Sequence, residues 1–266
     1  MWLEPSAVAT TSAAPIPPSV SLTQAHPGSD TSSASPSDTS SSVSEAMSAA
    51  TIKEFVNKVA AGDPSAKDFA VPGTSVAVYA ESTGEFTQSN PGVAGSTQPV
   101  PSGSNGWTIS QGVVLSDFVM SPEGLIADAS RNGVPLSKIV APGDGTVYVR
   151  SPDGQFDTFT GQANFTVRAY RLFGDSLQVL VDIDNQSSAD ASVSFDSYVA
   201  NGRQYPQLLD AGMGDASQPT KPTVKRTAMT IVGSGAPSGG TLSLRHAINY
   251  STSQEGAWTM TVPNLG

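Results

Sequence analysis

His246 is the residue of this chain best suited to acid–base chemistry near neutral pH, because an unperturbed imidazole changes its charge there. It falls, however, in the apolar register of a predicted strand, between Leu244 and Ile248, where a side chain packs into a core. The other histidine, His26, stands in a Ser/Thr-rich stretch, and no Gly-x-Ser-x-Gly sequence supplies a serine nucleophile. We therefore expect no catalytic residue and a non-enzymatic protein. An extracellular hydrolase that uses His246 is the alternative.

Three aspartates in or beside glycine-containing turns, Asp144, Asp153 and Asp157, are weak candidates for a metal site. Carboxylate oxygens bind hard cations when two such loops converge. Aspartates in turns more commonly hydrogen-bond their own backbone, so we expect no bound metal and no other cofactor. Asp182 and Asp184 have the spacing of calcium-loop ligands, but Ser187 stands where that loop requires glycine. The chain has no cysteine, which excludes disulfides and thiolate-held metals.

Tyrosines supply the weak candidates for a binding surface, because an exposed aromatic cluster on a soluble protein marks a place for a partner. The four candidates are Tyr148, Tyr170, Tyr198 and Tyr205. The ligand itself is unknown from the sequence, and a protein or a glycan at a cell surface fits such residues equally well.

Charge and hydropathy exclude two classes of partner. The chain carries 13 Lys and Arg against 23 Asp and Glu, for a formal net charge of −10, and its basic residues do not cluster. Such a chain would repel phosphate, so we expect no nucleic acid partner. No apolar run approaches the roughly 20 residues that a membrane-spanning helix needs, so we expect no transmembrane segment.

The elements that would position these residues begin after a tail. Residues 1–50 are rich in Ser, Thr, Ala and Pro and contain no Lys or Arg, which predicts a disordered, stalk-like segment. Residues 51–106 are expected to hold a short helix, a strand and a Gly/Pro/Ser-rich loop. The helix is predicted over Ser48–Ala61 with a capping box at Thr51 and Glu54, the strand over Thr74–Ala80, and the loop over residues 84–106.

Strand patterns dominate residues 107–266. Leu177, Val179, Val181 and Ile183 alternate with polar residues and predict one buried face. Tight hairpin turns are predicted at Gly174-Asp175 and Asn201-Gly202. The predicted strands are Trp107–Met120, Thr146–Arg150, Asn164–Leu172, Leu177–Asp184, Ala191–Ala200, Thr223–Val232, Thr241–Tyr250 and Ala257–Val262. The pattern is typical of an antiparallel β-sandwich, so we expect an all-β fold with one short N-terminal helix.

A resemblance sharpens this expectation. The resemblance rests on four neighbouring features: the strand Leu177–Asp184, the following Asn185-Gln-Ser-Ser, the strand around Phe195 and the hairpin Asn201-Gly-Arg-Gln-Tyr205. Over about residues 163–250, this pattern resembles the telokin-like extracellular lipoprotein domains of bacteria. The resemblance implies an immunoglobulin-like sandwich. Members of that family carry a lipidated cysteine near the N-terminus, and this chain has no cysteine.

Together these features favour a secreted or cell-envelope immunoglobulin-like module on a flexible stalk, with a binding or structural role. No basic and apolar signal sequence follows Met1, so an exported protein would carry its leader upstream of that residue. A structural subunit of a virion or an appendage, with the tail as a flexible arm, is a further alternative.

Overall fold

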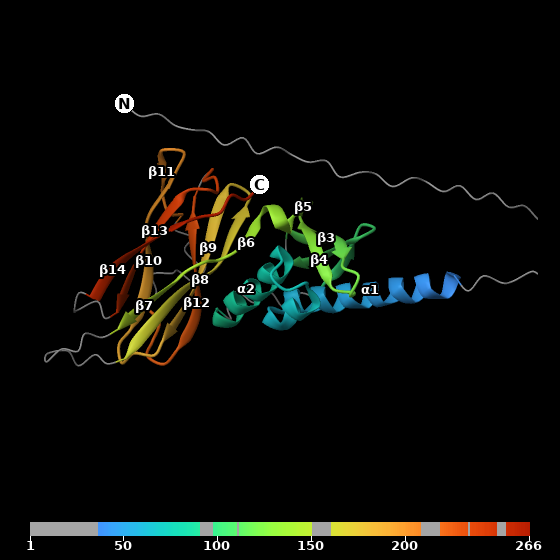
Figure 1. The fold of residues 1–266 in the computed structure, drawn as a ribbon, viewed down its shortest axis with the longest axis horizontal. Helices are drawn as coiled ribbons and strands as arrows, with labels where there is room; N and C mark the ends of the chain where they lie inside the picture. Colours follow the sequence, from blue (N-terminus) through green and yellow to red (C-terminus); the bar gives the residue numbers. More distant parts are fainter. Residues whose placement is uncertain are drawn as a thin grey trace, which may run out of the picture.

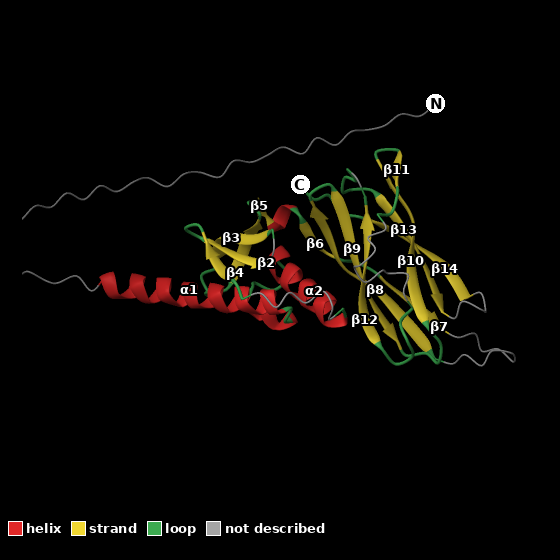
Figure 2. Cartoon of the chain, turned by 180° about the vertical axis from the view of Figure 1, so that it is seen from behind, coloured by secondary structure: helices red, strands yellow, loops and turns green. Residues whose placement is uncertain are grey.

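The computed structural model describes residues 37–90, 98–110, 112–150, 161–208, 219–233, 235–248 and 254–266. Most of the described elements are strands, all paired antiparallel within their sheets, which confirms the expectation of a mainly β protein. Figures 1 and 2 show helices and a small sheet at one end of an elongated molecule and two larger sheets at the other. Asp153 and Asp157 lie outside the described residues.

Helix α1 (Ser37–Ala61) ends where the sequence predicts but begins earlier. Residues 37–47 were predicted to belong to the disordered tail, and the prediction is wrong for these residues. The predicted capping box is also wrong, because Thr51 lies inside the helix and donates from Oγ1 to the Met47 carbonyl. The second half of α1 buries Phe55, Val56 and Val59, whereas its first half projects from the body (Figure 1). Among the described residues, no helix is long and apolar enough to cross a membrane.

Helix α2 (Ser75–Ser89) occupies the segment where the sequence predicted a strand and then a loop. The alternation of Val76 and Val78 misled that prediction, since Val76, Tyr79, Ala80 and Phe86 are buried along one helical stripe. The Thr74 side chain caps the first turn by accepting from the Ala77 N–H. Gly84, which suggested a loop, lies inside the helix. Its lack of a side chain leaves room for the Pro64 backbone of η1 (Pro64–Phe69), which a Cβ would overlap.

A small sheet packs against these helices. It contains five strands: β1 (Val100–Ser102), β2 (Gly106–Ser110), β3 (Val113–Met120), β4 (Ile126–Arg131) and β5 (Val134–Pro135). The single strand predicted over Trp107–Met120 is in fact the pair β2 and β3, which turns near Gly112 at a φ of 74°. Leu115, Ile126 and Leu136 share one hydrophobic core with Phe55 and Val76. Residues 107–140 therefore pack with the helices, whereas the sequence analysis grouped them with the later strands.

Two larger sheets share a second hydrophobic core. We call the first the front sheet; it contains β12 (Lys225–Val232), β9 (Ser176–Asn185), β8 (Gln162–Phe173), β6 (Val140–Pro142) and β7 (Thr146–Arg150). The back sheet contains β11 (Arg203–Tyr205), β10 (Ala191–Ala200), β13 (Thr241–Ile248) and β14 (Gln254–Thr261). The predicted inward face of Leu177, Val179, Val181 and Ile183 is confirmed, since all four are buried with back-sheet residues such as Leu244.

Both predicted hairpin turns are confirmed. Gly174 has a φ of 62° in the turn that joins β8 to β9, where Phe173 pairs with Ser176. Asn201 and Gly202 have φ values of 51° and 73° between β10 and β11, as a two-residue turn of this hand requires. These turns make β8 and β9 neighbours in the front sheet and β10 and β11 neighbours in the back sheet.

Helix α2 lies against the outer face of the front sheet, and a bulge in β8 adapts that face to the helix. The register of β8 on β9 shifts between Val167 and Ala169, so Arg168 is the extra residue. Val167 and Tyr170 both point into the core as a result. Arg168 and Arg171 both point outward and donate to side chains of α2.

Candidate functional site

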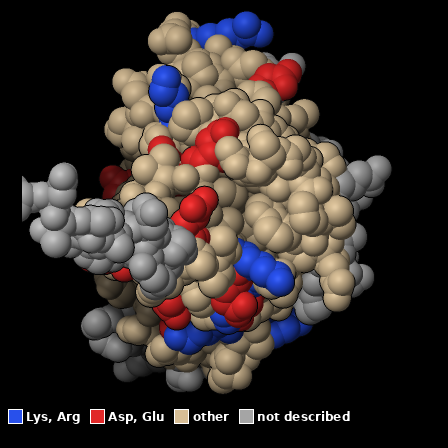
Figure 3. Space-filling view, turned by 90° about the vertical axis from the view of Figure 1, so that its right-hand side faces the viewer, with Lys and Arg blue, Asp and Glu red and all other residues tan. Residues whose placement is uncertain are grey.

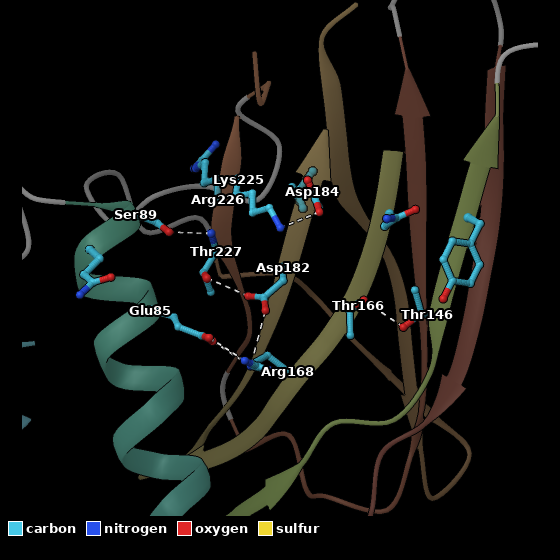
Figure 4. Close-up of a pocket in the computed structure, with 14 residues that line it drawn as sticks. Glu85, Ser89, Thr146, Thr166, Arg168, Asp182, Asp184, Lys225, Arg226 and Thr227 are labelled. Carbon is cyan, nitrogen blue, oxygen red and sulfur yellow. Dashed lines mark hydrogen bonds and ion pairs between the residues drawn. The ribbon is translucent and has the colours of Figure 1, made fainter. Parts of the chain in front are cut away.

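A groove of about 590 Å³ opens on the outer face of the front sheet, beside the C-terminal end of α2. We call it the sheet groove (Figure 4). Strands β7, β8, β9 and β12 form its floor, and the last turns of α2 form one wall. Its lining comprises Glu85, Gln88, Ser89, Thr146, Tyr148, Asn164, Thr166, Arg168, Asp182, Ile183, Asp184, Lys225, Arg226 and Thr227.

The strand register arranges the floor in two cross-strand rows. In one row, paired positions run from β7 to β12 through Tyr148, Asn164, Asp184 and Lys225. In the neighbouring row they run through Thr146, Thr166, Asp182 and Thr227. Four adjacent strands at their usual spacing make each row about 14 Å long. The floor is thus a polar strip that runs across the strands.

The wall at α2 is held by Arg168, which projects from the β8 bulge. Its Nε and Nη2 atoms donate to the two carboxylate oxygens of Glu85 at 2.8 and 2.6 Å, and Nη2 also reaches Glu81 at 3.1 Å. A planar guanidinium matches a carboxylate in this two-bond geometry. The nearby carboxylates raise the pKa of Arg168 further above its ordinary value, with the hydrogen bonds to Glu85 as the largest cause.

The end of α2 is also tied to β12. Ser89 Oγ accepts from the Thr227 backbone N–H at 2.8 Å, and Asn90 Nδ2 donates to the Thr227 carbonyl at 3.1 Å. Phe86 packs beside these contacts on Leu180 and Met229. The helix therefore closes one part of the outer face and ends where the groove begins.

Asp182 lies at the centre of the charged part of the groove. It accepts from Thr227 Oγ1 at 2.7 Å and lies 3.5 Å from Arg168 Nε (Figure 4). Its pKa is nevertheless raised above the ordinary value, mainly because burial disfavours the charged carboxylate, with Glu85 and Glu81 adding to the effect. This carboxylate belongs to a network that already uses its oxygens.

The charges that line the groove balance one another. Three acidic residues (Glu85, Asp182 and Asp184) face three basic ones (Arg168, Lys225 and Arg226). Asp184 pairs with Lys225 at 2.9 Å, so each of the three carboxylates has a cationic neighbour. The groove therefore offers hydrogen bonds rather than a net charge.

At the other end of the groove, the lining residues that the structure describes are uncharged. The Thr146 and Thr166 hydroxyls lie 2.9 Å apart on neighbouring strands (Figure 4). Asn164 adds a carboxamide, and Tyr148 on β7 stands at the rim with 66% of its surface exposed. This is the end at which an aromatic ring is available to a ligand.

The structure separates the four candidate tyrosines. Tyr148 is exposed and lines the groove, whereas Tyr170, Tyr198 and Tyr205 are buried in the core of the two larger sheets. Tyr170 donates from its hydroxyl to Asp144 Oδ1 at 2.9 Å, and burial raises its pKa. The four therefore do not form one exposed cluster, and the three buried rings stabilise the fold.

The structure engages the predicted metal candidate Asp144 in that same hydrogen bond with Tyr170. Within the described ranges, no group of three or more His, Asp or Glu side chains gathers as a cation site would require.

His246 lies inside the core and not in the groove. Its ring stacks on Phe165 of the front sheet at a centroid distance of 5.6 Å, and the lack of a side chain at Gly256 on β14 makes room for it. Nδ1 is buried without a hydrogen-bond partner among the described residues, and desolvation lowers the pKa of His246. These surroundings suit packing and offer no reacting group.

Sequence analysis missed most of the groove. Arg168, Glu85, Thr166 and Lys225 were not singled out, and Asp182 and Asp184 were considered only as a calcium loop. One signal was present, because outward positions two residues apart are polar on all four strands. The order and register of the strands, which place these residues in rows, could not be derived from that signal.

Searches against protein-family models and against curated proteins gave no match for this chain.

Proposed function

We propose that this protein is a non-enzymatic binding module, and that the sheet groove is its ligand site. The observation that carries the proposal is the pair of polar cross-strand rows, which line a groove beyond the end of α2 and are covered by none of the described helices. Ligand sites are concave surfaces with a few convergent polar groups, and the groove has this form. Its carboxylates are held by Arg168, Lys225 and Thr227, which argues against a free acid or base for catalysis.

We further propose that the two larger sheets form an immunoglobulin-like sandwich, as the resemblance to telokin-like domains implies. Their shared core and the stacking of His246 on Phe165 across it support this fold. On the same basis we propose a secreted or cell-envelope location. The few charged residues on the face seen in Figure 3 are of both signs, which fits a partner other than nucleic acid.

A substitution that fills the sheet groove tests whether the groove is the ligand site. Thr166→Trp places an indole in the middle of the floor, and Thr259→Trp, at an exposed position of the back sheet, is the matched control. The native protein and both variants would be titrated, by calorimetry, with neutral oligosaccharides, acidic oligosaccharides and mixed peptides. We expect a ligand that binds the native protein and the control but not Thr166→Trp. Equal binding to Thr166→Trp, or no binding to any of the probes, would contradict the proposed function.

A further inference from the structure

Building on the proposed function, we infer that the ligand of the sheet groove is a neutral glycan, whose sugar ring stacks on Tyr148 and whose hydroxyls bond to the polar rows.

Tyr148 places an exposed aromatic ring at the edge of the sheet groove. Tyr148 exposes 66% of its surface, so the flat faces of its ring are open to a ligand. Tyr148 is held by strand pairing, with Tyr148 opposite Asn164 on β8, so the backbone that carries its ring is fixed beside the groove. A fixed, flat and amphipathic surface suits the apolar face of a pyranose ring.

The balance of charge is the second step. A phosphorylated, sulfated or uronic acid chain would require a cation without a carboxylate neighbour, and an amine-rich peptide would require a free carboxylate. Arg168 is committed to Glu85 and Glu81, and Lys225 to Asp184. A charged ligand would compete with these partly exposed pairs, whereas a neutral ligand leaves them intact.

The chemistry of the uncharged end is the third step. Hydroxyls and carboxamides both donate and accept, so Thr146, Thr166 and Asn164 can match the mixed donors and acceptors of sugar hydroxyls. The rows are about 14 Å long across four strands, which is room for a short oligosaccharide rather than a single sugar. We therefore assign the tyrosine end to stacking and the rows to hydrogen bonding along the chain.

The test compares ligand classes on one protein. Native protein would be titrated with cello-, malto-, manno- and laminari-oligosaccharides, and separately with heparin and oligogalacturonate, at low and high salt. We expect a neutral chain to bind, with a dissociation constant that hardly changes with salt because no ion pair forms across the interface. Tyr148→Ala should weaken that binding by about tenfold or more, while Tyr148→Trp, which keeps a flat ring, retains it. Val199→Ala, which trims an exposed side chain of the back sheet, is the control and should change nothing.

The remaining outcomes show whether the glycan inference fails alone or together with the proposed function. Salt-sensitive binding of heparin or oligogalacturonate that Thr166→Trp abolishes would overturn the neutral glycan and leave the groove as the ligand site. Neutral binding that survives Tyr148→Ala unchanged would overturn the stacking role. Binding of peptides alone, blocked by Thr166→Trp, would also overturn the glycan. The absence of binding for every probe would overturn both proposals.

Discussion

Arg168 of β8 donates two hydrogen bonds to Glu85 of α2, although 83 positions separate the two residues in the sequence. This contact joins the helical end of the molecule to the front sheet and forms one corner of the sheet groove. Arg168 faces outward next to the buried Val167, and the β8 bulge at this position lets Arg171 face α2 as well. The proposed ligand site and the junction between the two cores therefore share a residue.

Replacing Arg168 by Ala should lower the free energy of unfolding by about 1 to 2 kcal/mol. The change removes a two-bond ion pair and leaves Glu85 and the half-buried Asp182 without their cation, although partial exposure to solvent limits the cost. Urea unfolding at neutral pH measures the difference. Lys221→Ala, which breaks the exposed pair of Lys221 with Asp190, is the control and should cost less than about 0.5 kcal/mol. Equal losses in the two variants would contradict the structural role of Arg168.

Replacing Gly84 by Ala should destabilise the protein by about 1 to 3 kcal/mol, because the new methyl group would overlap the Pro64 backbone. In an isolated helix the same change would stabilise by about 1 kcal/mol. The sign of the effect in thermal unfolding therefore tests whether η1 crosses α2 at this glycine. Gln88→Ala, at an exposed position of the same helix, should stay within about 0.5 kcal/mol of the native protein.

The burial of His246 predicts that the free energy of unfolding of the protein falls in mild acid. Desolvation lowers its pKa in the folded protein below the ordinary 6.5, so the unfolded chain binds a proton more readily. The stabilising effect of a neutral His246 is complete above pH 6.5 and is lost as the pH falls toward the lowered pKa. Urea unfolding at a series of pH values should show a smaller acid loss for His246→Phe than for the native protein. Parallel curves for the two proteins would mean that His246 has the same pKa in the folded and unfolded chains, and would contradict this prediction.

Asp63 should also lose its contribution to stability in acid, but at a lower pH than His246. The Lys58 ammonium, with the Ser65 N–H, lowers the pKa of Asp63 from 3.8 to about 2. Its contribution is therefore present above pH 3.8 and disappears as the pH falls toward 2. Asp63→Asn should be less stable than the native protein by no more than about 1 kcal/mol at pH 6, since the pair is partly exposed. The gap should close near pH 2, and a gap that stays constant with pH would exclude the ion pair as its source.

Local patterns in the sequence predicted much of the two larger sheets. Asn201-Gly202 and Gly174 marked their turns, and the alternation of Val179, Val181 and Ile183 marked the buried face of β9. These features depend on residues that are neighbours along the chain. Tyr148 could likewise be chosen as a candidate from the sequence, because an aromatic residue type alone suggests a binding role.

The helical end and the groove depend on contacts between distant segments. Gly84 resembles a loop residue until η1 is placed against it, and Val76 and Val78 alternate as a strand would. The β8 bulge, which lets Arg171 face α2 as Arg168 does, is marked by no turn residue in the sequence. Pairing of Thr166 with Asp182, and of Asp182 with Thr227, requires the register of three strands at once.

Chemical-shift mapping of a bound oligosaccharide tests the central claim most directly. The neutral chain that binds tightest would be titrated into isotope-labelled protein, and the backbone amide signals followed by NMR. If the ligand lies in the sheet groove, the shifted signals cluster on residues 146–148, 164–168, 182–184 and 225–227, with the last turn of α2. Shifts confined to the back sheet or to the small sheet would place the ligand elsewhere and contradict the account.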